Sequence, residues 1–271
     1  MNNKNIHKIN NKSELNFKFL APIYRNKVQI VLNFINNNDL ILDLGCGKGV
    51  YHRFFKKSIG IDKELSDLKK LKSSNHIVIL ADAGHLPIKE NSIQNIICIN
   101  TLEYVSDLKK TYKEIFRILK HNGKLILVVD NFDYPLIFDP INFLICRLGL
   151  KPISYGAWNW KQTRRFKKDQ LVNDLKNTGF SIKKSEFFSH YLICIFNYFE
   201  CAFYNSFLSS EYKNSYMLNS KNIKTKNENK NIPKLIFLCL NFISKIICGL
   251  DNLIFKNSNG ANILIIAKKG K

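Results

Sequence analysis

The stretch Ile41-Leu42-Asp43-Leu44-Gly45-Cys46-Gly47-Lys48-Gly49 decides the fold of this chain. Its first residues are apolar apart from Asp43, which is typical of a short buried strand. The strand then breaks into closely spaced glycines, which let the backbone turn tightly and approach a ligand that a Cβ atom would exclude. We expect a helix to follow, because its N-terminus would offer free N–H groups to that ligand.

The spacing of the glycines counts against one class of ligand. Folds that bind dinucleotides use the pattern G-x-G-x-x-G at this point. Here Gly49 falls one position early, and Val50 occupies the expected site. NAD and FAD are therefore disfavoured.

Strand-like and helical segments alternate along the chain after this loop. The strand-like segments are 40–44, 58–61, 76–80, 93–100, 124–129, 180–188 and 261–267. The helical segments are 17–35 (interrupted at Pro22), 65–71, 112–119 and 168–178, and residues 121–123 are predicted as a turn. Continuous apolar strands that alternate with helices indicate βαβ units and a parallel sheet covered on both faces.

Two acidic residues follow the glycines at the ends of predicted strands. Asp62 ends the second strand, about twenty residues after the glycines, where a carboxylate can accept both hydroxyls of a ribose. Asp82 ends the third strand beside Ala83, where it can accept from an exocyclic amine. Each acid alone is typical of a cap or a solvated strand end. Together with the glycine loop they predict a ligand site at the carboxyl edge of the sheet.

With these features in place, the sequence resembles the class I S-adenosylmethionine-dependent methyltransferases, in particular the small-molecule branch similar to ubiquinone/menaquinone methyltransferases. The resemblance runs from about residue 39 to 188 and resumes at 261. It is carried by segments 41–49, 60–62, 81–87, 102–105, 118–124 and 169–180. It implies a Rossmann-like α/β fold, with a parallel sheet whose last strand is antiparallel and a helical insertion between the last two strands.

The resemblance also implies a role for individual residues toward S-adenosylmethionine. Asp43, Gly45, Cys46 and Gly47 would line the methionine end of the cofactor, Asp62 would hold the ribose, Asp82 and Ala83 would contact the adenine, and Asn100 and Thr101 would lie near the sulfonium. The sequence does not identify a catalytic base, and His85 and His190 are the remaining candidates.

Three parts of the chain follow from this reading: an N-terminal arm and lid helix (1–38), a Rossmann-like domain (39–188 with 259–271) and an apolar insertion (189–258). The insertion joins two apolar pieces, 191–208 and 235–255, through a Lys/Asn-rich piece, 213–230. It is interpreted either as a helical cap over the substrate end or as a hairpin in a membrane interface. A spanning helix is disfavoured because Lys245 would fall near the bilayer middle.

Composition limits the partners and the compartment. The 271 residues contain 42 Lys and Arg against 21 Asp and Glu, a net charge of +21 that favours an anionic membrane face or nucleic acid. The 7 cysteines lack zinc or disulfide spacing, so we expect no metal and a cytoplasmic protein, with a peripheral membrane location as the alternative.

We predict a methyltransferase for a small or lipid-like acceptor. The alternatives are an RNA methyltransferase, with nucleic acid the less favoured partner, and a non-catalytic membrane-associated scaffold.

Overall fold

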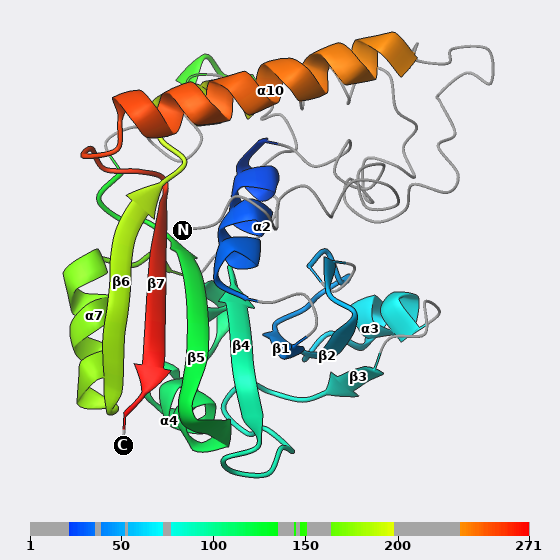
Figure 1. Cartoon of the computed structure of the whole chain (residues 1–271), viewed down its shortest axis with the longest axis vertical. Helices are drawn as coiled ribbons and strands as arrows, with labels where there is room; N and C mark the ends of the chain where they lie inside the picture. The colour runs from blue at the N-terminus through cyan, green and yellow to red at the C-terminus, as the bar shows by residue number, and fades with distance from the viewer. Residues whose placement is uncertain are drawn as a thin grey trace. The chain divides into compact units, whose positions relative to one another are not determined.

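The computed structural model describes residues 22–35, 39–51, 54–72, 77–134, 144, 147–150, 164–197 and 234–270 (Figure 1). The chain divides into two compact units. One unit comprises residues 31–188 and 256–271 and contains the sheet, and the other comprises residues 1–30 and 189–255. The two units are described separately below.

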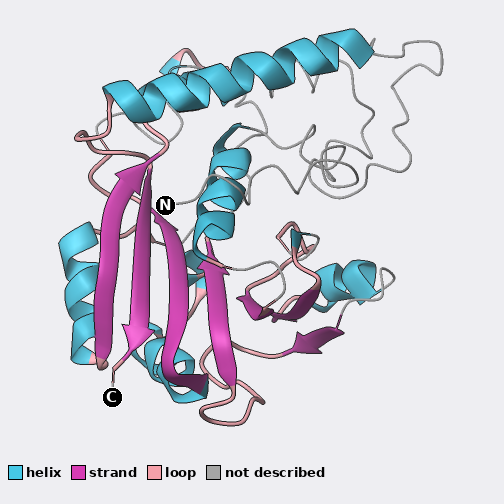
Figure 2. Cartoon of the chain, viewed as in Figure 1, coloured by secondary structure: helices cyan, strands magenta, loops and turns pink. Residues whose placement is uncertain are grey.

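The first unit is built on a seven-stranded mixed sheet, drawn in magenta in Figure 2. Its strands are β1 (Leu40–Leu44), β2 (Lys57–Asp62), β3 (Ile77–Leu80), β4 (Ile93–Ile99), β5 (Leu119–Asp130), β6 (Phe180–Phe188) and β7 (Asn262–Lys269). They lie in the order β3-β2-β1-β4-β5-β7-β6, and β7 alone runs antiparallel to both of its neighbours. The predicted fold class is confirmed. Because β1 lies between β2 and β4, the glycine loop is placed beside the ends of two other strands.

Helices α4 (Leu108–Ile118) and α7 (Lys168–Asn177) contribute to the main hydrophobic core. Tyr112 and Ile115 of α4 and Leu171 of α7 are buried in one cluster with side chains of β1, β4, β5 and β7. Helix α4 begins earlier than the apolar periodicity predicts, because the Asp107 carboxylate accepts the N–H of Lys110 and caps its first turn. Helix α3 (Leu65–Lys72) contributes to a second, smaller cluster, in which its Leu68 packs with Cys46 of the glycine loop.

Two local predictions are wrong. Residues 121–123 do not form a separate turn, because β5 continues through them with a register shift opposite Ile93 and Asn95. The left-handed backbone of Asn122 (φ 60°) absorbs the extra residues as a bulge within the strand. Directly after the glycines, residues 47–51 form turns rather than a helix. Gly47 and Gly49 both have positive φ angles, which a right-handed helix does not contain.

The second unit contains a short helix (191–197) and the long helix α10 (Lys234–Ile254). The buried carboxylate of Asp251 on α10 accepts N–H groups of His190 at 2.7 Å and Leu192 at 2.8 Å, and so caps the short helix from a distant part of the chain. Helix α2 (Pro22–Phe34) begins at the proline that the sequence marks as an interruption. The Lys/Asn-rich piece, 213–230, lies outside the described residues. Within the described part of the chain, no helix has the length and apolarity needed to cross a membrane.

Candidate functional site

The glycine loop forms a tight cradle at the carboxyl end of β1. The N–H groups of Gly45 and Cys46 both donate to the Ile61 carbonyl of β2, at 2.7 and 3.0 Å. Gly45 has a φ of +74°, and a Cβ atom there would lie 2.1 Å from the Thr101 hydroxyl oxygen. Thr101 is held in that position because its hydroxyl donates to the Leu44 carbonyl at 2.9 Å. Only glycine therefore fits between the ends of β1 and β4.

Asp62, at the end of β2, reaches across to the loop. Its Oδ2 accepts the Gly47 N–H at 2.7 Å, and its Oδ1 accepts the Glu64 N–H at 2.9 Å. A carboxylate oxygen accepts two hydrogen bonds, so each oxygen retains acceptor capacity. The half-buried Asp62 is therefore anchored by the backbone and still suited to bind a pair of hydroxyls.

Asp43 and Cys46 lie deeper in the same region. Asp43 is 2% exposed, and its Oδ2 takes no hydrogen bond from the described residues. Burial, and to a lesser extent the carboxylate of Asp62, raises the pKa of Asp43 to about 8. Burial raises the pKa of the Cys46 thiol above its ordinary range, and that side chain packs in a small hydrophobic cluster with Leu68.

The segment that carries Asp82 and Ala83 follows β3. Asp82 is exposed, its carboxylate accepts the Gly84 N–H at 2.7 Å, and Ala83 is buried. Because the Ala81 N–H donates to the Asp62 carbonyl at 3.1 Å, this segment begins next to the end of β2. The structure thus brings the three predicted features to one edge of the sheet.

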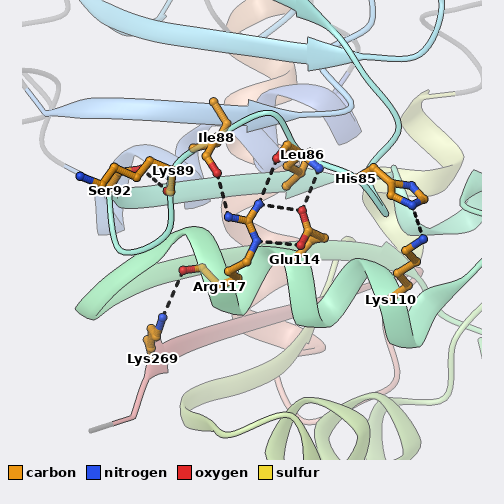
Figure 3. Close-up of polar contacts among 9 residues, drawn as sticks. All are labelled: His85, Leu86, Ile88, Lys89, Ser92, Lys110, Glu114, Arg117 and Lys269. Carbon is orange, nitrogen blue, oxygen red and sulfur yellow. Dashed lines mark hydrogen bonds and ion pairs between the residues drawn. The ribbon is translucent and has the colours of Figure 1, made fainter.

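Two residues of α4 hold the far end of that segment (Figure 3). Arg117 donates to the carbonyls of Leu86 and Ile88, at 3.0 and 2.9 Å, while Glu114 accepts the Leu86 N–H at 2.8 Å. Arg117 and Glu114 also form an ion pair at 2.8 Å. The hydrogen bond from Arg117 lowers the pKa of Glu114. We call Arg117, Glu114 and the two backbone positions that they bind the α4 clamp. No local sequence pattern indicates it.

A buried polar network surrounds Asn100 at the end of β4. Its backbone is left-handed (φ 50°), and its amide nitrogen donates to Glu103 Oε1 at 3.1 Å and Asp130 Oδ1 at 2.9 Å. Asn262, at the start of β7, donates to the same Asp130 oxygen at 2.7 Å. Glu103, Asp130 and Asn262 are each 1% exposed or less. Sequence reasoning missed these three residues as a group, because three separate strand ends contribute to the network.

The two candidate bases are in different surroundings. His85 is exposed and contacts the ammonium of Lys110 (Figure 3). His190 is buried in the other unit, where its backbone N–H donates to the Asp251 carboxylate. Among the described residues there is no group of three or more His, Cys, Asp or Glu side chains that could hold a metal ion.

A family model described as a methyltransferase domain matches residues 42–127, which span β1 to β5 and every residue of the glycine loop. The chain belongs to the class I S-adenosylmethionine-dependent methyltransferases. S-adenosylmethionine is the cofactor of this family, and the chain's residues fit it. Gly47 leaves the space beside the Asp62 carboxylate open, Asp62 offers acceptors for a ribose, and the Asp43 carboxylate has an oxygen without a partner among the described residues.

The chain is also similar to individual proteins. Two uncharacterized proteins of Methanocaldococcus jannaschii are 39% and 31% identical to this methyltransferase, over 53% and 61% of its length. The matches cover 64% and 73% of those proteins. The ubiquinone/menaquinone biosynthesis C-methyltransferase of Haemophilus ducreyi is 28% identical over 41% of this chain and 47% of its own.

Solved structures show the same fold. A SAM-dependent methyltransferase from Archaeoglobus fulgidus superposes with a TM-score of 0.54, covering 99% of this chain and 100% of its own at 15% identity. At that identity the likeness concerns the fold alone.

Proposed function

We propose that this methyltransferase transfers a methyl group from S-adenosylmethionine to a small or lipid-like acceptor by in-line displacement. The contact between Asp62 and Gly47 carries the proposal. It places a carboxylate with remaining acceptor capacity 2.7 Å from the backbone nitrogen of Gly47, beside which a Cβ atom would meet nothing nearer than the same carboxylate, at 4.0 Å. A ribose has two neighbouring hydroxyl donors, and the methionine end of the cofactor needs a close backbone.

The roles of the remaining site residues follow from their positions. Asp43, Gly45, Cys46 and Gly47 would line the methionine end, with Cys46 acting through its backbone because its thiol packs toward α3. Asp82 and Ala83 would contact the adenine, at the edge that the α4 clamp supports. Asn100 and Thr101 would lie near the sulfonium at the end of β4.

Methyl transfer by in-line displacement depends mainly on the alignment of the acceptor with the methyl group. When bound, the cofactor supplies a methyl group on a positively charged sulfur. The chain's task is to hold an acceptor in line with it, an effect worth up to roughly 7–11 kcal/mol. The network of Glu103 and Asp130 suits that task, because it fixes Asn100 in a single rotamer at the strand end. A general base is needed only for an acceptor that must lose a proton.

One relative bears on the class of acceptor. The Haemophilus ducreyi relative is named for ubiquinone/menaquinone biosynthesis, which supports a small or lipid-like acceptor here. We also propose that the insertion, 189–258, serves acceptor entry, and that the protein is cytoplasmic with a peripheral location at a membrane.

The test is a methyl-transfer assay with labelled S-adenosylmethionine. The full chain is incubated separately with the lipid, polar small-molecule and RNA fractions of a cell extract, and label is followed in each. We expect label in the lipid or the small-molecule fraction, and its loss in the Asp62→Asn variant. Label found only in RNA would contradict the proposed acceptor class. If the chain binds the cofactor but none of the three fractions is labelled, the scaffold alternative is supported.

A further inference from the structure

Helix α10, the long orange helix of Figure 1, buries two polar side chains and exposes several large apolar ones. Phe242 is 66% exposed and Leu253 is 76% exposed, although both are large and apolar. Ser244 and Asp251 are completely buried. The apolar face of α10, as we define it, consists of Phe242, Ile243, Ile246, Leu250, Leu253 and Ile254, which are all exposed. A helix packed for water alone shows the opposite arrangement.

The orientation of α10 within its unit is fixed by specific contacts. Asp251 binds the N–H groups of His190, Leu192 and Ile193. One turn later, the ring of Phe255 packs edge-on against Tyr191, with ring centroids 5.1 Å apart. Rotating the helix to hide its apolar face would break these contacts and leave the Asp251 carboxylate without its donors. The exposed apolar face is therefore a consequence of how this unit is built.

The charge around this face is positive. Helix α10 contains a single acidic residue, Asp251, and that residue is buried. Lys245 is exposed, and lies next to the apolar face on a helical wheel, separated from it by Gly249. An apolar strip bordered by Lys245, on a helix whose single acidic residue is buried, is complementary to the surface of a bilayer that contains anionic lipids.

We propose that the apolar face of α10 binds the surface of an anionic phospholipid membrane, with the helix lying parallel to the bilayer. The helix then inserts its large apolar side chains between the head groups, and Lys245 remains at the level of the phosphates. The proposal does not depend on the methyl-transfer reaction, because none of these residues belongs to the cofactor site.

Vesicle flotation of the full chain tests the proposal. Vesicles of phosphatidylcholine alone are compared with vesicles that also contain phosphatidylglycerol, at low and high salt. We expect flotation with the anionic vesicles, weakened by salt. The double variant Phe242→Ser/Leu253→Ser should partition at least about tenfold more weakly. Lys245→Gln should weaken partitioning by about fivefold.

Matched variants on α3 separate this face from a general effect of composition. Leu65→Ser removes another exposed apolar side chain, and Lys69→Gln removes the same charge as Lys245→Gln. Both controls should float like the wild type. Equal flotation of wild type and double variant, or no flotation at all, would overturn the proposal. A concentration-dependent dimer that the same double variant dissociates would also overturn it, because the face would then bind a second copy of the chain. Cofactor binding, measured in parallel, should stay unchanged in every variant.

Discussion

The carboxylate of Asp62 accepts the backbone N–H of Gly47 at 2.7 Å. This hydrogen bond joins the end of β2 to the loop that follows β1. It therefore holds the Asp62 carboxylate beside the loop before any ligand binds. The adjacent contact between Gly45 and Thr101 closes the other side of the loop from β4. The geometry of the site therefore depends on the relative positions of the ends of β1, β2 and β4.

Replacing Gly45 with alanine should destabilise the fold by about 2–4 kcal/mol, because the new Cβ meets Thr101 as well as a strained backbone. Gly149 provides a matched control, since its φ is +72° and no atom lies within 4 Å of a Cβ built there. Gly149→Ala should cost only about 1–2 kcal/mol. Urea denaturation compares the two variants. Equal losses would mean that the Thr101 contact is not important.

The stability of the cofactor-free protein should fall as the pH rises toward about 8. The pKa of Asp43 is 3.8 in the unfolded reference and about 8 in the folded protein, so folding takes up a proton between these values. The contribution of Asp43 is therefore fully present at low pH and lost as the pH rises through its folded pKa. Asp43→Asn should remove up to about 4 kcal/mol of this dependence between pH 5 and 8. Thermal denaturation of both proteins across that range measures it, and parallel curves would contradict the assignment.

Asn100→Ala should be far more damaging than a change at a comparable exposed position. The variant removes donors from two buried carboxylates, which costs about 2–4 kcal/mol. Asn122 has a similar positive φ but is exposed, so Asn122→Ala reports the backbone strain alone. The difference between the two losses of unfolding free energy measures how much the hydrogen bonds of the Asn100 side chain contribute to stability. A difference near zero would show that Glu103 and Asp130 do not need the amide of Asn100.

The α4 clamp should control the order of the segment that carries Asp82. Arg117→Ala removes its hydrogen bonds to the carbonyls of Leu86 and Ile88, and should accelerate amide hydrogen exchange across residues 82–92. Lys184→Ala breaks a different ion pair, the one with Glu186, and should leave that exchange unchanged. Cofactor affinity should fall by about threefold to tenfold in the Arg117 variant only. Unchanged exchange in both variants would contradict a positioning role.

Much of this architecture can be predicted from the sequence because its signals are local. Each of the seven strands coincides with an apolar segment, and Asp62 and Asp82 are recognisable because they stand at strand ends. The failures come from contacts between distant residues. The continuation of β5 through residues 121–123 depends on its pairing with β4, which no local pattern encodes.

The insertion, 189–258, is a second example of contacts that local sequence patterns do not predict. A helical wheel of α10 identifies its polar stripe, but does not tell that Asp251 on that stripe faces inward to cap residues 190–193. For the same reason the partnership of Asn262 with Asp130 is invisible along the chain, where the two residues are far apart. Local periodicity predicts elements, whereas the pairing of buried polar groups requires the assembled fold.

Calorimetric titration of S-adenosylmethionine into wild type and Asp62→Asn tests the central claim most directly. Asparagine preserves the size of the side chain and an acceptor for the Gly47 N–H, so the comparison isolates the carboxylate charge. We predict micromolar-range binding to the wild type, a loss of about 1–3 kcal/mol in the variant, and no loss for Asp169→Asn, an exposed acid on α7. Equal binding by wild type and Asp62→Asn, or no binding to the wild type, would contradict the account.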